Sequence, residues 1–157
     1  MVHAFLITLF AFTALKYLSW ELSKKTDYKK HLWFLVAAVS CTFFAYLLTA
    51  YYKDRAGNFL YHAIGGGVAS SFLYRYLLKQ FKCKLNWRLE LITLFAFTCS
   101  LGVLNELAEY ALELMHFATL SFDTHDTWRD LAANSFGALT GWLIYRLAVH
   151  FAKSTQK

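Results

Sequence analysis

Long apolar runs recur along this chain, and the short connections between them carry most of the charged residues. The 157 residues are 58% hydrophobic and 19% aromatic and include no proline, which is far more apolar than a soluble domain. A transmembrane helix needs about 20 mainly apolar residues, and several runs approach that length. The pattern predicts a single all-α domain, a polytopic integral membrane helical bundle, with no polar stretch long enough for a water-soluble domain.

About five transmembrane helices account for the apolar runs. The uncharged cores of the last two, at 91–105 and 131–145, are shorter than a full span, so hydropathy should rank these two helices weakest. The first run has neither a basic leader nor a small-residue cleavage site, which indicates a retained helix. The expected helices cover residues 2–20, 32–52, 58–78, 91–117 and 130–151.

The basic residues predict the orientation of the bundle. With five alternating spans, only Lys53, Arg55 and Arg129 fall on one side, and the other thirteen Lys and Arg residues fall on the opposite side. Positively charged connections face the cytoplasm. We therefore expect a multi-pass cell-membrane protein with the N-terminus outside and the C-terminus in the cytoplasm. The net charge of +6 follows the same rule and indicates no nucleic-acid partner.

Three glutamates lie near the outer end of the fourth expected helix. A charge in hydrocarbon is costly unless it is paired, hydrated or bound to a metal ion. Glu113 and His116 are close enough to the headgroups to be solvated, whereas Glu106 and Glu109 lie a turn or more deeper. These residues belong to one stripe at helical spacing, which comprises Gly102, Glu106, Glu109, Glu113 and His116.

A second polar stripe lies on the fifth expected helix and includes two more acids. Asp130 has an alternative role there, because Thr127 as N-cap and Asp130 three residues later fit a capping box. Asn134 lies beyond the reach of a cap and needs a partner inside the bundle. The stripe comprises Asp126, Asp130, Asn134, Gly137 and Gly141.

His62 lies near the outer end of the third expected helix and is followed by the glycines Gly65–Gly67. Small residues permit close helix contact, which would bring His62 towards the acids. Histidine can then act as a ligand, a general acid or base, or a charge partner. Carboxylate oxygens suit Mg, Ca or Mn, and a histidine ligand also admits Zn. The candidate metal ligands are His62, Glu106, Glu109, Asp126 and Asp130.

Two arginines complete the outer cluster. Arg55 and Arg129 are the only arginines expected on that side. Each could bind a phosphate or carboxylate of a substrate with two hydrogen bonds, and each could instead pair with a neighbouring acid, Asp54 or Asp130. Together with Asn134, the two arginines are the candidate substrate-binding residues.

Three segments resemble the VanZ-like and YjdF-like families of small bacterial and archaeal membrane proteins. Residues 58–66 read N-F-L-Y-H-A-I-G-G, residues 105–110 read N-E-L-A-E-Y, and residues 126–138 read D-T-W-R-D-L-A-A-N-S-F-G-A. The families have D-x-x-x-H-x-x-G-G, W-E-x-x-E-Y/W and D-T-x-x-D-L-x-x-N-x-x-G-A in this order. Asn58 and Asn105 replace the family Asp and Trp, so Asp54 could substitute for the missing acid. The resemblance implies an envelope protein, and the VanZ name is tied to teicoplanin resistance.

Three functions stay open. The first is a metal-dependent or acid/base-dependent envelope enzyme, such as a hydrolase or transferase, that acts on a membrane lipid or lipid-linked phosphorylated substrate. Its catalytic residues would be His62, Glu106, Glu109 and Asp130, and Arg129 would stabilise the substrate anion. The second is transport of a cation, proton or amphiphile, although acids in the outer half alone do not make a complete path. The third is a structural or accessory role, in which the cluster locks the helices of a homo-oligomer or a larger membrane complex.

Overall fold

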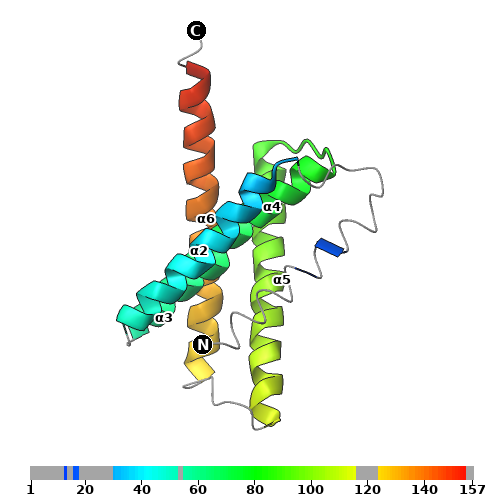
Figure 1. The fold of residues 1–157 in the computed structure, drawn as a ribbon. Coiled ribbons are helices and arrows are strands. Elements are labelled where there is room, and N and C mark those ends of the chain that lie inside the picture. Colours follow the sequence, from blue (N-terminus) through cyan, green and yellow to red (C-terminus); the bar gives the residue numbers. More distant parts are fainter. Residues whose placement is uncertain (1–12, 14–15, 18–29, 53–54, 116–123, 155–157) are drawn as a thin grey trace.

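The computed structural model describes residues 13, 16–17, 30–52, 55–115 and 124–154, and these residues form helices only (Figure 1). This confirms the all-α class for the described part of the chain. The first expected helix, at 2–20, lies almost entirely outside the described residues. The elements are α2 (Leu32–Tyr51), α3 (Arg55–Leu60), η1 (Tyr61–Val68), α4 (Ala69–Gln80), α5 (Trp87–Leu114) and α6 (Thr124–Ser154).

Two described helices, α2 and α5, are long and apolar enough to cross a membrane. Large apolar side chains on both of them are exposed, for example Val36, Phe43 and Ile92. A helix that is apolar on its outer faces as well as its inner one suits a lipid environment. The prediction that the fourth helix would be one of the two weakest spans was wrong, because α5 meets the length and composition criterion while α6 does not.

The long helices begin earlier than the apolar pattern predicts. α5 starts at Trp87, against an expected 91, because the Asn86 side chain accepts a hydrogen bond of 3.0 Å from the backbone amide of Leu89 and caps the helix. α6 starts at Thr124, against an expected 130, and runs to Ser154. Thr127 is therefore inside the helix, and the capping box predicted for Thr127 and Asp130 is wrong.

The third helix is continuous from residue 55 to residue 80, but its middle part, η1, is a π-helix. At its end the amide of Ala69 donates to the carbonyl of Ile64, five residues back. Carbonyls of this stretch also accept hydrogen bonds from hydroxyl groups, which suits a buried backbone with no water at hand. The donors are Thr42 to Gly65, Ser70 to Gly67 and Ser71 to Val68.

η1 packs between α2 and α6, while α5 lies against α6 (Figure 1). The backbones of η1 and α6 touch. A Cβ atom added to Gly137 would lie 1.8 Å from the carbonyl oxygen of Ala63, and one added to Gly67 would lie 2.3 Å from that of Asn134. Only glycine permits this approach of the two backbones. The contact therefore sets the position of His62 along the axis of α6.

At the opposite end, α4, α5 and α6 enclose a buried ion pair between Arg75 and Glu90. Trp142 donates a hydrogen bond of 2.7 Å from its Nε1 to Oε1 of Glu90, and the Arg75 guanidinium lies 4.0 Å from the centre of the Tyr145 ring. The sequence pattern predicts that both charges lie on the cytoplasmic side of the bundle, and it predicts no pairing between them. Their pairing joins three helices beside the apolar cluster around Leu94.

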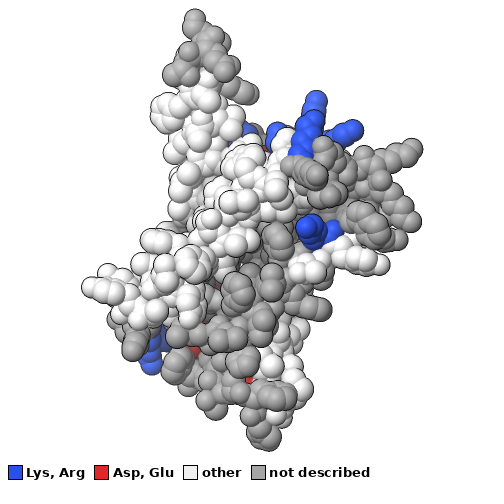
Figure 2. All heavy atoms as spheres, in the orientation of Figure 1, with Lys and Arg blue, Asp and Glu red and all other residues white. Residues whose placement is uncertain are grey.

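Charged residues gather at the two ends of the bundle. Figure 2 shows several Lys and Arg side chains near the α4–α5 connection, while the acidic side chains visible on this face lie towards the other end, where a further basic side chain is also visible. The sequence explains the basic group, since four basic residues lie within or beside this connection. They are Lys79, Lys82, Lys84 and Arg88.

Candidate functional site

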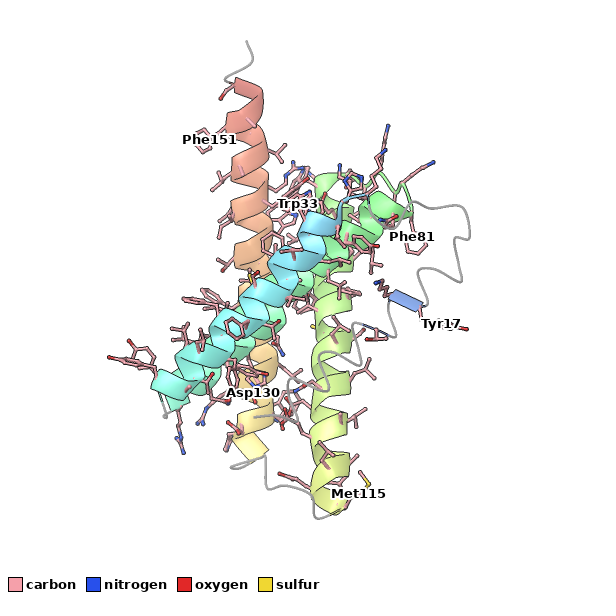
Figure 3. The ribbon with its side chains drawn as sticks, in the orientation of Figure 1. Tyr17, Trp33, Phe81, Met115, Asp130 and Phe151 are labelled. Atoms are coloured by element: carbon pink, nitrogen blue, oxygen red, sulfur yellow. The ribbon has the colours of Figure 1, made fainter. Side chains whose placement is uncertain are left out.

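Three helices bring His62, Glu106 and Asp130 together at the acidic end of the bundle. Nε2 of His62 lies 3.2 Å from Oδ2 of Asp130. One ligand atom from each of the three residues lies within 4.8 Å of the other two, which is close enough for a single metal ion. In Figure 3, Asp130 lies in the part of α6 nearest its N-terminus, beside the α3–η1 helix.

Glu106 has one oxygen with an unsatisfied environment. Its Oε1 is fully buried and makes no hydrogen bond within the described structure. A buried acceptor without a partner costs about 1–3 kcal/mol, and more if it is charged. A cation at this position would remove that cost, because it would accept electron density from the same oxygen.

Two amides stabilise the acids. Nδ2 of Asn58 donates to Oδ1 of Asp130 at 2.9 Å and to Oδ1 of Asp126 at 3.4 Å. Nδ2 of Asn105 donates to Oε1 of Glu109 at 2.7 Å. Asn58 and Asn105 are the two positions where the chain departs from the patterns that it resembles. Both departures place a neutral donor beside a carboxylate.

The other predicted acidic residues, Asp126 and Glu109, lie outside the group of three potential metal ligands. Asp126 is buried and shares Asn58 with Asp130. Glu109 is half-buried and accepts a hydrogen bond from Asn105. Glu113 is half-buried near the end of α5, and His116 lies outside the described residues.

Both candidate arginines are exposed. Arg129 lies on α6 immediately before Asp130, yet the two side chains form no ion pair among those that the described residues make. Arg55 opens α3 and is exposed as well, with an interaction of its own. Arg129 is therefore exposed and next in sequence to a buried residue of the site, a position that we call the rim of the site.

Sequence reasoning missed the role of Asn58 and Asn105 as donors and the pairing of Arg75 with Glu90. The donor role had a signal, because an amide one helical turn from a carboxylate is within hydrogen-bond reach, as Asn105 and Glu109 are. The pairing of Arg75 with Glu90 had none, since it depends on how α4 and α5 pack after the turn at 81–86.

The arrangement offers three ligand atoms of the kinds that divalent cations prefer, a carboxylate oxygen twice and an imidazole nitrogen once. Three protein ligands on one side of an ion leave its other positions for water or substrate. The donor Asn58 holds Asp130 in place, which is the usual task of a group behind a metal ligand, and Asn105 does the same for the neighbouring Glu109. The chemistry of the site therefore fits a cation.

A family model described as "Predicted membrane protein (DUF2238)" matches residues 1–150 of the chain. No curated protein and no solved structure matches the chain significantly. The matched range includes all three groups at the centre of the site and both amide donors.

Proposed function

The chain belongs to the DUF2238 family of predicted membrane proteins, and from this premise we propose that it binds one divalent cation through His62, Glu106 and Asp130. The observation that carries the proposal is the buried Oε1 of Glu106, which makes no hydrogen bond within the described structure although the residue lies beside a histidine and a second carboxylate. Three different helices supply the ligands, so that binding the ion would also hold the bundle together.

We propose further that the cation serves a reaction on a membrane lipid or lipid-linked phosphorylated substrate. Bound there, a divalent ion polarises a phosphoryl or ester oxygen or activates a water molecule. Asn58 and Asn105 would keep Asp130 and Glu109 in position, and Arg129 at the rim would bind the substrate anion. With it we propose five membrane spans, a site on the outer face, and membership of the VanZ-like and YjdF-like group.

One observation favours a second function, an internal lock between helices. His62 and Asp130 already form a pair at 3.2 Å, and Asn58 bonds to Asp130 from α3. A His–Asp pair with an amide donor can stabilise helix contacts without an ion. The lock predicts that no cation binds and that removing the Glu106 carboxylate leaves the protein equally stable or more stable.

Titration of the purified protein with Mn²⁺, followed by electron paramagnetic resonance in detergent or nanodiscs, separates the two functions. We expect one bound Mn²⁺ per chain, displaced by excess Mg²⁺.

Glu106→Gln keeps the shape of the side chain and should weaken Mn²⁺ binding at least about 100-fold, since it removes a charged ligand. Glu113→Gln on the same helix is the matched control and should leave the affinity unchanged. A wild-type protein that binds no Mn²⁺, or a Glu106→Gln variant that binds it equally well, contradicts the proposal.

Asn58→Asp should make the thermal stability of the protein depend more strongly on the bound cation. The change places a third carboxylate beside Asp130, whose Oδ1 lies 2.9 Å from the present amide nitrogen. Like charges at that distance repel, so we expect a lower thermal stability without the ion and a larger rise in stability when Mn²⁺ is added than in the wild type. Thermal unfolding in detergent with and without Mn²⁺ measures both effects, with Asn58→Ala as the control that removes the donor and adds no charge. An equal rise in Asn58→Asp and in the wild type would count against a cation at this position.

A further inference from the structure

A second layer of residues lies one turn deeper in the bundle than the three proposed ligands. Each ligand has a partner four residues further into the membrane on its own helix. Two of these partners are glycines and the third is an asparagine, so the asparagine side chain reaches into the space that the glycines leave between the helices. The pairs are His62 with Gly66, Glu106 with Gly102, and Asp130 with Asn134.

The amide of Asn134 occupies the space that the two glycines leave. A Cβ atom on Gly66 would lie 1.8 Å from Oδ1 of Asn134, and one on Gly102 would lie 3.1 Å from its Nδ2. Asn134 is 5% exposed. Its Oδ1 and the Oε1 of Glu106 are the two buried side-chain atoms of the described residues that make no hydrogen bond. Both atoms are acceptors, and they belong to adjacent layers of the same three-helix junction.

The side chain of Asn134 leans towards the ligands. In an α-helix each Cα–Cβ bond tilts towards the N-terminus, and on α6 this is the direction from Asn134 to Asp130. The rise of one turn is about 5.4 Å. A cation–oxygen bond of about 2.1 Å followed by an O–H···O hydrogen bond of about 2.8 Å covers nearly this distance. A spacing of one helical turn is therefore of the size that one water molecule bridges between a cation in the upper layer and the amide oxygen in the lower one.

We propose that Asn134 is a positioning residue whose Oδ1 accepts a hydrogen bond from a water molecule bound to the cation on its buried side. This inference rests on the proposed cation site and narrows the ion that the site selects. Mg²⁺ and Mn²⁺ take six ligands, so three protein ligands and this water leave two positions open to a substrate. Zn²⁺ commonly takes four ligands, and the same water would complete its shell and leave no position for a substrate. A retained water on the buried side favours Mg²⁺ or Mn²⁺. It also leaves the outer positions of the ion to the substrate, so the reacting group approaches from the rim near Arg129.

Electron spin echo envelope modulation of bound Mn²⁺ in D₂O counts the water molecules on the ion and tests this inference. Asn134→Leu replaces the amide by an apolar group, and we expect one water fewer on Mn²⁺ and an affinity about 10–100-fold lower, which is the usual effect of losing a group behind a metal ligand. The preference for Mn²⁺ over Zn²⁺ should fall in the same variant. Ser135→Ala is the matched control, because Ser135 bonds to the backbone of its own helix, and it should change neither the water count nor the affinity.

Asn134→Asp tests the same contact in the opposite direction and decides the matter if the leucine variant does not fold. A carboxylate oxygen accepts the hydrogen bond more strongly, so Mn²⁺ should bind at least about fivefold more tightly with the water count unchanged. An unchanged affinity in Asn134→Asp, or an unchanged water count in a folded Asn134→Leu, overturns the role of Asn134 while the cation site stands. A wild-type protein that binds no Mn²⁺ overturns both.

Discussion

Glu90→Gln is expected to lower the free energy of unfolding by about 3–5 kcal/mol, the cost of breaking a buried ion pair by removing one partner. Arg75 and Glu90 are 7% and 5% exposed, so neither charge can be rehydrated without opening the contact between α4 and α5. Glutamine still accepts the hydrogen bond from Trp142, and the loss is therefore that of the charge opposite Arg75. Unfolding with sodium dodecyl sulfate, monitored by far-ultraviolet circular dichroism, measures the change.

The double variant Arg75→Met with Glu90→Gln is the control, because it removes both charges and leaves the acceptor for Trp142. Replacing a buried pair by uncharged groups is often neutral or stabilising, so this variant should recover most of the stability. Trp142→Phe removes one hydrogen bond and should cost only about 1 kcal/mol. If Glu90→Gln unfolds at the same detergent concentration as the wild type, the pair does not join the three helices in the way that the structure indicates.

Gly137→Ala is expected to lower the free energy of unfolding by about 3 kcal/mol, at the upper end of the cost of overpacking, and to abolish Mn²⁺ binding. The added methyl group would lie 1.8 Å from the carbonyl oxygen of Ala63 and 2.6 Å from its carbonyl carbon. These are backbone atoms, which cannot rotate away, so α6 and η1 must separate. His62 and Asp130 are on these two elements, and their 3.2 Å contact cannot survive the separation.

Gly141→Ala is the matched control on the same helix, one turn further along. There the added methyl group would lie 2.3 Å from Oγ of Ser71, and a side-chain hydroxyl can adopt another rotamer. We expect a cost of about 1 kcal/mol or less, near the value of one hydrogen bond, and unchanged Mn²⁺ binding. Two variants of equal effect would show that the approach of η1 to α6 is not what positions His62.

Hydropathy predicts the helices well where an apolar run meets charged residues and poorly where a helix continues into polar sequence. α2 follows its expected range to within one residue, since charges flank its apolar run on both sides. α6 extends beyond its apolar core at both ends, and its first turns carry polar and acidic side chains. Those turns are helical because they pack against α3 and η1, and this packing is a tertiary effect that periodicity does not contain.

The spacing of acids and glycines predicts which residues of the site approach one another, and the structure brings His62, Glu106 and Asp130 together. The stripes do not separate Glu106 from Glu109, because both lie on one face of α5. In the structure Asn105 donates to Glu109, and Glu106 is the carboxylate that belongs to the three-residue group. The assignment of individual carboxylates therefore requires the neighbours of each, which the sequence pattern alone does not specify.

Relatives that form an ordinary α-helix in place of η1 should align with this chain only when one residue is skipped within Gly65–Gly67. A π-helical turn closes its hydrogen bond over five residues, whereas an α-helical turn closes it over four. The chain therefore holds an extra residue in η1, and an α-helical relative needs one residue fewer for the same sides of α3 and α4 to contact their neighbours. Alignments without this gap would match His62 to the wrong position in such relatives. Deleting Gly66 or Gly67 would shorten the chain there without adding a side chain, whereas a substitution would place a Cβ atom 1.8 Å or 2.3 Å from an oxygen of Asn134.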